Sequence, residues 1–137
     1  MPVRGIGVDV VKVERLVESL GRFGERMEKR LFTEGELEYC RRHKNPHPHL
    51  AARFAAKEAC AKALGTGVRQ GVFWRDMGVV NLPSGRPTLE LTGGAALVLA
   101  RLTPEGHEVR IDLSITDDFP TAQAIVIISA VRVPRRD

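Results

Sequence analysis

The feature of this sequence that most constrains its fold is an alanine-rich stretch, residues 49–64, which ends at Gly65-Thr66-Gly67. Alanine, leucine, lysine, glutamate and arginine favour helices, and a glycine directly after the last apolar residue is typical of a helix C-terminus. At 100° per residue, one face of such a helix carries large apolar side chains and a second face carries only alanines. A helix that is apolar on two sides is buried, so the sequence predicts a long central helix.

The same stretch carries four charged side chains, which are Arg53, Lys57, Glu58 and Lys62. Burying a charge is costly unless the charge is paired or bound to a metal or ligand. In one interpretation these charges form i,i+4 pairs on a half-exposed surface, which are worth about 0.2–0.5 kcal/mol each. In the other interpretation, three cations and one carboxylate form a site for a metal-bound polyphosphate. The stretch alone leaves both interpretations open.

Composition limits the function classes that need to be considered. The chain has 137 residues, of which 43% are hydrophobic, and we expect a single domain over residues 1–137. A net charge of +4 suits an acidic partner, whether nucleic acid, phosphorylated ligand or acidic protein. Aromatic residues make up only 5% of the chain, which argues against a surface that stacks single-stranded bases. We expect no nucleic-acid partner. A small nucleic-acid-binding domain is kept only as an alternative, which predicts salt-sensitive binding to generic DNA or RNA.

The small number of cysteines and the lack of a long apolar stretch bear on where in the cell the protein is found. Cys40 and Cys60 are too few for a disulfide framework, and Cys60 falls in the predicted buried helix, where a reduced cysteine acts as a small hydrophobe. The sequence contains no apolar stretch of about 18 residues and no secretory signal. We therefore expect a cytoplasmic protein with no membrane partner.

The N-terminal segment predicts a strand followed by a helix. Isoleucine and valine alternate along residues 3–11 with Gly5, Gly7 and Asp9, which is the period of a strand. The two glycines leave bare backbone on one face, with room for a ligand or a packed helix. Asp9 can also simply cap the helix expected at residues 12–28, which should break at Gly21 or Gly24. The basic outer surface of that helix is either a solvated face or a surface for an acidic helical partner.

The rest of the chain predicts an α+β fold. Thr33 and Glu36 have capping-box spacing, so a short helix should begin at Thr33 and continue to about residue 42. Residues 43–49 contain two prolines and three histidines and predict a loop without the fixed geometry of a metal site. We expect strands at residues 72–82, 88–91, 109–116 and 121–131, a helix at 93–102, and turns at 83–87 and 117–120. Four or five strands should form a mainly antiparallel sheet packed against the long central helix.

Several blocks along nearly the whole chain, taken together, resemble one family. They are Gly5-Ile6-Gly7-Val8-Asp9, Arg15, Phe32-Thr33-Glu34-Gly35-Glu36, the run from Arg53 to Ala59, the run from Lys62 to Gly67, Gly85-Arg86-Pro87 and Ser114-Ile115-Thr116. In this order they resemble the holo-[acyl-carrier-protein] synthases, the small type of 4′-phosphopantetheinyl transferase. The central blocks are the specific part of the resemblance, whereas the first or the Gly-Arg-Pro block alone would be weak.

The resemblance implies a group-transfer reaction. Coenzyme A gives its 4′-phosphopantetheine to a serine hydroxyl of apo acyl carrier protein, and adenosine 3′,5′-bisphosphate is released. The nucleophile belongs to the partner, so the chain needs no Ser-His-Asp arrangement, and we find none in the sequence. Such an enzyme must hold the pyrophosphate, neutralise developing charge and align the incoming hydroxyl.

The resemblance also implies roles for individual residues. Asp9 and Glu58 would bind Mg²⁺, with Mn²⁺ as an alternative ion, because two carboxylates plus substrate phosphates are typical Mg²⁺ ligands. Lys62 would lie near the transferring phosphate and either steady its charge or protonate the leaving phosphate. Coenzyme A contacts are implied for Arg53, Lys57, Gly65, Thr66, Gly67, Ser114 and Thr116, with backbone N–H groups of residues 65–67 facing phosphate. Arg15, Arg22 and Arg26 would face the acidic carrier protein, and the family is typically a homotrimer with sites between subunits.

One position departs from the family pattern. The family usually has a histidine after the Ser-Ile-Thr block, where this chain has Asp117. A carboxylate cannot donate a hydrogen bond to a phosphate, and it repels the phosphate when ionised. Either Asp117 or Asp118 acts as a base or extra metal ligand, or another group substitutes, or activity is low. We expect retained activity because the other expected site residues are present; the alternative is a carrier-protein-binding relative with weak or no transferase activity.

Overall fold

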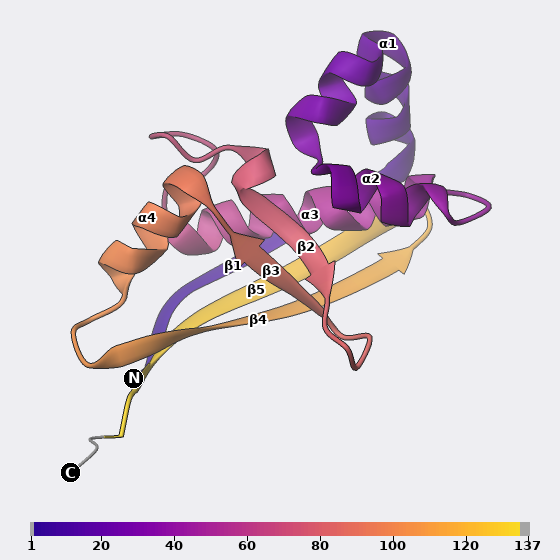
Figure 1. Ribbon diagram of the computed structural model, residues 1–137. Coiled ribbons are helices and arrows are strands. Elements are labelled where there is room, and N and C mark those ends of the chain that lie inside the picture. The colour runs from indigo at the N-terminus through magenta and orange to yellow at the C-terminus, as the bar shows by residue number, and fades with distance from the viewer. Residues whose placement is uncertain (1, 135–137) are drawn as a thin grey trace.

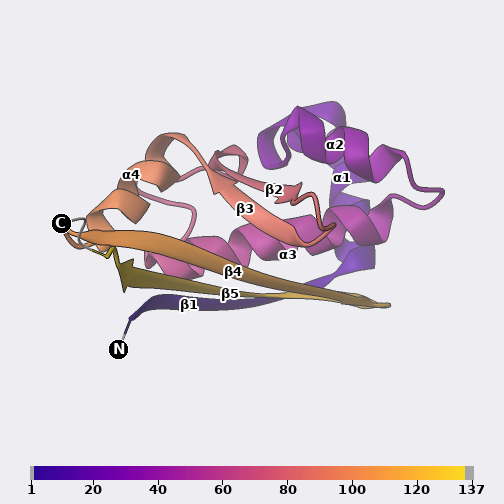
Figure 2. The ribbon, with the colours of Figure 1, turned by 60° about the horizontal axis from the view of Figure 1, so that its bottom comes forward.

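Helix α3 (His47–Leu64) lies at the centre of the molecule, between two layers of the chain (Figure 1). The structure is a computed structural model that describes residues 2–134. Below α3 lies a sheet with the order β1-β5-β4, and on the other side lie further helices and a second, two-stranded sheet (Figure 2). The other elements are β1 (Val3–Lys12), α1 (Val13–Leu31), α2 (Glu34–Arg41), the 3₁₀ helix η1 (Trp74–Asp76), β2 (Met77–Asn81), β3 (Pro87–Leu91), α4 (Gly93–Leu102), β4 (His107–Asp118) and β5 (Thr121–Arg132).

The predicted fold class is confirmed, with one difference in the sheets. All strand pairs are antiparallel, and the long helix packs on the sheet as expected. The five strands nevertheless form two sheets and not one, because the β2-β3 hairpin lies on the opposite side of α3 from the three-stranded sheet (Figure 2). Among residues 2–134, no helix is long and apolar enough to cross a membrane.

Three predicted boundaries were wrong. The expected loop at residues 43–49 ends early, because α3 already begins at His47; Pro48 fits its first turn, where the missing N–H of proline is not needed. The strand expected at residues 72–82 begins only at Met77, after the 3₁₀ helix. The turn expected at 117–120 is shorter, because Asp117 and Asp118 continue β4 and pair with the start of β5.

Other local predictions are confirmed. Helix α1 is interrupted at Gly24, whose φ of 67° and ψ of −150° are not helical. The capping box of α2 is formed, with Thr33 N donating to Glu36 Oε1 at 2.9 Å and Glu36 N donating to Thr33 Oγ1 at 3.2 Å. Cys60 is fully buried in α3 as a free thiol, and burial raises its pKa to about 12.

The two glycines of β1 bring that strand directly onto the backbone of α3. A Cβ atom added at Gly5 would lie 1.9 Å from the carbonyl oxygen of Ala63, and one added at Gly7 would lie 1.7 Å from that of Ala59. The alanines that α3 turns toward this strand are buried. Of the two possibilities that the glycines left open, a ligand or a packed helix, the structure has the packed helix.

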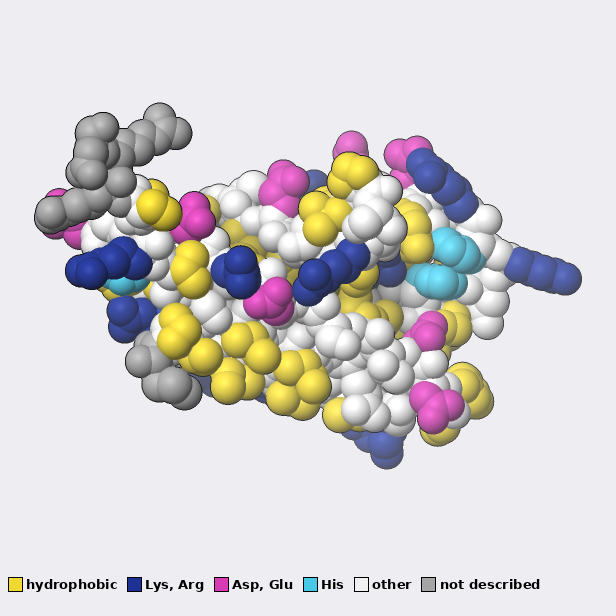
Figure 3. Space-filling model, turned by 90° about the horizontal axis from the view of Figure 1, so that it is seen from below, with side chains coloured by type: hydrophobic (Ala, Val, Ile, Leu, Met, Phe, Trp, Pro, Cys, Tyr) yellow, Lys and Arg dark blue, Asp and Glu magenta, His cyan; other side chains and the backbone are white. Residues whose placement is uncertain are grey.

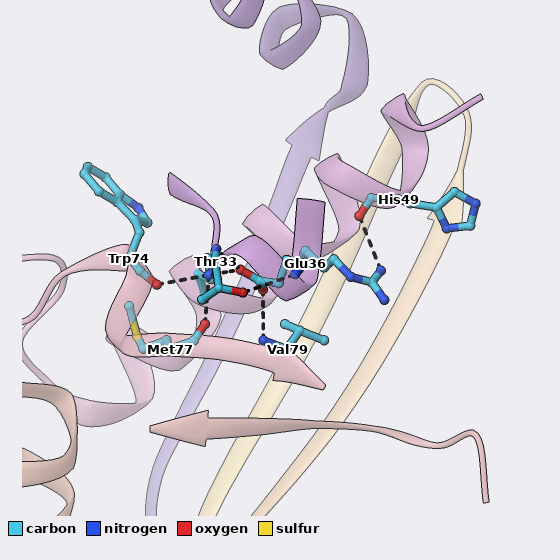
Figure 4. Close-up of polar contacts among 8 residues, drawn as sticks. Thr33, Glu36, His49, Trp74, Met77 and Val79 are labelled. Atoms are coloured by element: carbon cyan, nitrogen blue, oxygen red, sulfur yellow. Dashed lines mark hydrogen bonds and ion pairs between the residues drawn. The ribbon is translucent and has the colours of Figure 1, made fainter. Parts of the chain in front are cut away.

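A buried ion pair joins α3 to α2. Lys57 and Glu36 have side chains that are 0% and 1% exposed, and Nζ lies 2.6 Å from Oε1. Lys57 Nζ also donates to the carbonyl oxygens of Trp74 and Met77, both at 3.0 Å (Figure 4). These three acceptors match the three N–H donors of an ammonium group. Burial lowers the pKa of Lys57, and the neighbouring Glu36 carboxylate opposes that shift.

The other partner of this pair is equally well satisfied. Glu36 Oε1 accepts the Thr33 N–H of the capping box, and Oε2 accepts the Val79 N–H of β2 at 2.9 Å (Figure 4). The ion pair therefore links α2, α3, η1 and β2 through hydrogen bonds that leave neither charge unpaired.

The face of the three-stranded sheet that points away from α3 is apolar and exposed. Ile6, Val8, Val10 and Ile125 are 45–60% exposed on this face. Side chains directly opposite in an antiparallel ladder lie on the same face, and Val8 pairs with Ile125. Figure 3 shows a continuous hydrophobic area here, along β1.

We expect Gly7→Ala to destabilise the fold by about 1–3 kcal/mol or more, because its methyl group would meet the backbone of α3 and not a movable side chain. Denaturant unfolding followed by circular dichroism measures this loss. Gly21→Ala is the matched control: it has no neighbouring atom within 4 Å of the new Cβ and should stabilise α1 by about 0.5–1 kcal/mol. Equal stabilities for the two variants would contradict the close contact between β1 and α3.

Lys57→Met should lower the free energy of unfolding by about 3–5 kcal/mol, because it leaves the Glu36 carboxylate buried without its partner. Lys29→Met is the control, since Lys29 forms an exposed i,i+4 pair with Glu25 that is worth about 0.3–0.5 kcal/mol. Urea unfolding of both variants gives the comparison. A loss at Lys57 no larger than that at Lys29 would show that the pair does not support the fold.

Candidate functional site

The first carboxylate of the site comes from β1. The contacts of Gly5 and Gly7 with α3 set which face of β1 points to the helix, and Asp9 lies two residues further along that face. Lys62 of α3 donates from Nζ to Asp9 Oδ1 and to the Val8 carbonyl oxygen, both at 3.0 Å. The Asp9 side chain is 16% exposed and that of Lys62 is 53% exposed, so the pair borders on solvent.

The second carboxylate comes from α3 itself. Glu58 lies one helical turn before Lys62, yet its Oε1 accepts a hydrogen bond from the indole Nε1 of Trp74 at 2.6 Å. In the described part of the chain, both ion pairs made by lysines of α3 reach other elements, Lys57 to Glu36 and Lys62 to Asp9. The interpretation of these charges as i,i+4 pairs on a half-exposed surface was therefore wrong.

Asp9 and Glu58 line one common pocket of about 480 Å³. Its other walls come from β1, α1, Phe54 of α3 and Thr121 of β5. Two carboxylates at the edge of an open pocket fit Mg²⁺, which is typically held by one or two carboxylates together with substrate phosphates and water. Within residues 2–134, no group of three or more His, Cys, Asp or Glu side chains forms a metal site, so a cation here would take its other oxygens from substrate or water.

Arg53 is buried near the start of α3 among aromatic rings. It is 6% exposed, its guanidinium lies 4.1 Å from the centre of the Tyr39 ring, and Nη1 donates to the His49 carbonyl oxygen at 3.5 Å (Figure 4). Its Nε is buried and has no hydrogen-bond partner among the described residues. A buried N–H without an acceptor is costly, and solvent does not reach this Nε, so an anion could contact it only after the surrounding side chains move.

Two histidines stack beside this arginine. The rings of His43 and His49 lie 3.7 Å apart, centre to centre, at an angle of 28°. Burial lowers the pKa of His49, as do the nearby His43 and Arg53, whereas the Asp117 carboxylate acts in the opposite direction. Asp117 pairs with buried Ala122 and thus belongs to the α3-facing side of the sheet.

The neighbouring residues of β4 point the other way. Ser114 and Thr116 are exposed and pair with Ile125 and Gln123 of β5, so their side chains lie on the outer face of the sheet. Asp9 and Glu58 lie on the α3 side. The expected coenzyme A contacts at Ser114 and Thr116 are thus separated by the sheet from the carboxylates of their own chain.

Two expectations about coenzyme A contacts were not met by the local geometry. The N–H groups of Gly65 and Gly67 donate to Lys62 O and Ala61 O, at 3.0 and 3.1 Å, because they close the C-terminus of α3. These two N–H groups are not free to face a phosphate, which corrects the expectation for Gly65 and Gly67. The side chain of Thr66 donates from Oγ1 within the loop, to the carbonyl oxygen of Gly67. Lys57 is fully buried with its donors satisfied, and we therefore assign it to the fold and not to a phosphate.

The three arginines of α1 that we expected to contact the carrier protein lie beside the two carboxylates. Arg15 lines the Asp9–Glu58 pocket, whereas Arg22 and Arg26 line an adjacent hollow of about 540 Å³. Met27 belongs to both, so the two hollows adjoin. Sequence analysis missed Trp74, which lines the second hollow and contacts Glu58; the only signal was that a single tryptophan stands in a glycine-rich loop after the helix.

Comparisons with known proteins match nearly the whole chain. The sequence profile of the 4′-phosphopantetheinyl transferase superfamily matches residues 5–123. A relative named holo-[acyl-carrier-protein] synthase, from Methylorubrum extorquens, is 60% identical over 131 residues, which are 96% of this chain and 96% of that protein.

Solved structures show the same fold. The crystal structure of holo-[acyl-carrier-protein] synthase from Neisseria meningitidis matches with a TM-score of 0.80 and 34% identity, over 93% of this chain and 98% of that one. The Helicobacter pylori enzyme in complex with coenzyme A matches with a TM-score of 0.76 and 27% identity, over 90% and 99% of the two chains. Because sequence and fold agree over nearly its whole length, the chain belongs to the 4′-phosphopantetheinyl transferase superfamily.

Proposed function

We propose that this chain transfers 4′-phosphopantetheine from coenzyme A to a serine hydroxyl of apo acyl carrier protein and releases adenosine 3′,5′-bisphosphate. The identity of 60% to a relative named for this activity supports the reaction, and the solved neighbour that holds coenzyme A supports the donor. The structural observation that carries the proposal is that Asp9 and Glu58, from two different elements, line one pocket next to Lys62.

In this proposal Asp9 and Glu58 hold Mg²⁺, or Mn²⁺ in its place. The ion, when bound, neutralises charge on the diphosphate of coenzyme A and on the transferring phosphoryl group. Lys62 keeps the Asp9 carboxylate oriented through its hydrogen bond, and its exposed ammonium can stabilise phosphate charge or give a proton to the leaving phosphate. The acceptor hydroxyl belongs to the carrier protein, so the chain's task is to align it and to hold the diphosphate.

The nucleotide end of coenzyme A would lie toward Arg53. The support for this placement is the positive charge of the Arg53 guanidinium at the start of α3, beside the stacked rings of His43 and His49. We retain Gly65, Thr66 and Gly67 as contacts for the donor through side chain or carbonyl atoms, since their glycine N–H groups close the helix.

The carrier protein would dock on α1. Acyl carrier protein is acidic, and the basic residues Arg15, Arg22 and Arg26 surround the two adjoining hollows next to the carboxylates. Opposite charges steer such partners together and orient them. Phe23, exposed between these arginines, offers an apolar contact in the same surface.

We also propose that the chain assembles with itself, as the homotrimer implied by the family resemblance. The exposed apolar face of the β1-β5-β4 sheet supports self-association, because contiguous apolar area of this kind is typical of an interface (Figure 3). Ser114 and Thr116 lie on this same face, so in an assembly they can reach a neighbouring subunit's site. That arrangement would reconcile their expected coenzyme A contacts with their separation from Asp9 and Glu58.

A second candidate function rests on Asp117. A carboxylate where the family has a histidine favours, on electrostatic grounds alone, a relative that binds carrier protein but transfers poorly. Burial, His43 and Arg53 lower the pKa of His49, and the Asp117 carboxylate opposes this shift only in part, so His49 does not supply a compensating positive charge. We favour retained activity because Asp9, Arg53, Glu58 and Lys62 are all present.

The proposal predicts that Glu58→Gln reduces Mg²⁺-dependent transfer by more than about 100-fold. This loss is larger than the one usually seen when a residue that only hydrogen-bonds to a metal ligand is replaced. Glutamine keeps an acceptor for the Trp74 indole, so the fold should be retained. The assay is the mass increase of apo acyl carrier protein incubated with coenzyme A and Mg²⁺. Glu38→Gln, at an exposed glutamate paired with Arg42, is the control and should transfer normally. Normal transfer by Glu58→Gln would remove Glu58 from the chemistry, and carrier-protein binding by the wild type without any mass increase would favour the second candidate.

Asp117→His should transfer phosphopantetheine as well as or better than the wild-type chain. An imidazolium can donate a hydrogen bond to phosphate, whereas the carboxylate that it replaces repels one. The measurement is kcat/KM for coenzyme A in the same assay, with Glu108→His at an exposed acidic residue of the same strand as control. A steep fall for Asp117→His alone would show that Asp117 has a role of its own, as a base or as a metal ligand.

A further inference from the structure

Trp74 donates a hydrogen bond to the proposed metal ligand Glu58, and nothing in the family comparison assigns a role to it. Its indole Nε1 donates to Glu58 Oε1 at 2.6 Å. An indole N–H can only donate, so Trp74 cannot itself bind a cation. A carboxylate has two oxygens with several lone pairs, so this bond leaves Oε2 available.

The tryptophan is itself held in place from three directions. Its ring lies nearly parallel to that of Phe54, 6.5 Å away between centres, and the Arg30 guanidinium lies 5.6 Å from the ring centre. Its carbonyl oxygen accepts a hydrogen bond from the buried Lys57 (Figure 4). The indole N–H is therefore a fixed donor, and it points at one oxygen of a glutamate whose side chain would otherwise rotate freely.

We propose that Trp74 is the positioning residue of Glu58: it binds Oε1 so that the carboxylate presents its other oxygen to the cation in the Asp9–Glu58 pocket. The inference rests on the proposed metal site and adds a residue to it. Carboxylates that bind metals are usually held by an outer hydrogen-bond donor, and loss of such a donor typically weakens metal binding or activity by about 10–100-fold.

The arrangement also links the metal site to the core. Lys57 stands one residue before Glu58 on α3 and fixes the backbone of Trp74, which in turn fixes the Glu58 side chain. The buried ion pair thus acts on the pocket through the tryptophan. Trp74 and Arg30 both line the adjacent hollow, so the indole ring also lies beside the basic surface of α1.

The test uses the fact that Trp74 is the single tryptophan of the chain. Replacing tryptophan throughout the protein by benzothienylalanine changes this position alone and substitutes sulfur for the N–H with little change in shape. Mn²⁺ affinity is measured by electron paramagnetic resonance of the free ion at saturating coenzyme A. We expect the affinity to fall by about 10–100-fold, with activity returning at high Mn²⁺ and an unchanged KM for coenzyme A at saturating metal.

Three comparisons make the outcome decisive. Incorporation of fluorotryptophan, which keeps the N–H, should restore Mn²⁺ affinity, and Phe73→Leu at the exposed neighbour should leave it unchanged. In a Glu58→Gln background, Trp74→Phe should cause no further loss, because the carboxylate to be positioned is gone. If Glu58→Gln weakens Mn²⁺ binding but the benzothienylalanine protein binds Mn²⁺ as tightly as the wild type, the metal site stands and only the role of Trp74 is overturned. Wild-type affinity in Glu58→Gln itself would overturn the metal site and this inference together.

Discussion

The direct contact between the backbones of β1 and α3 is the constraint on which the rest of the structure depends. Gly5 and Gly7 face Ala63 and Ala59 at a separation that admits no side chain on the strand. Because side chains alternate along a strand, this contact decides that Asp9 points to the helix and that Ile6 and Val8 point away. This one packing contact therefore determines both the orientation of the Asp9 carboxylate in the candidate site and the exposed apolar face of the sheet.

The four charged side chains of α3 form two groups with different roles. Lys57 is fully buried and holds the fold together through Glu36 and two carbonyl oxygens, and Arg53 is buried against an aromatic ring. On the opposite flank of the helix, Glu58 lines the pocket and accepts a hydrogen bond from Trp74, and Lys62 forms an ion pair with Asp9, which lines the same pocket. A helix that is apolar on two sides can carry four charges because each one has a partner on another element or an aromatic neighbour.

The sequence predicted the elements better than it predicted their partners. Local signals were sufficient for the capping box of Thr33, the interruption at Gly24 and the end of α3 at Gly65, since each depends on neighbouring residues. The position of the β2-β3 hairpin and the complete burial of Lys57 could not be predicted in this way. Both depend on contacts between residues far apart in the sequence, such as those of Lys57 with Glu36 and Met77, and hydrophobic periodicity does not encode such contacts. The convergence of Asp9 and Glu58 on one pocket followed from the family resemblance, and Trp74 escaped notice because nothing local to it indicates a carboxylate 16 residues earlier.

The Lys57–Glu36 network has a consequence for how sequences of this fold can diverge. A single ammonium group is shared by a glutamate of α2 and by carbonyl groups of two further segments. A neutral residue at position 57 would strand the carboxylate at position 36, and a neutral residue at position 36 would strand the ammonium. Each single change would cost about 3–5 kcal/mol, whereas replacing both residues by apolar ones of similar volume is often neutral. Selection would therefore tend to keep both residues or to replace both.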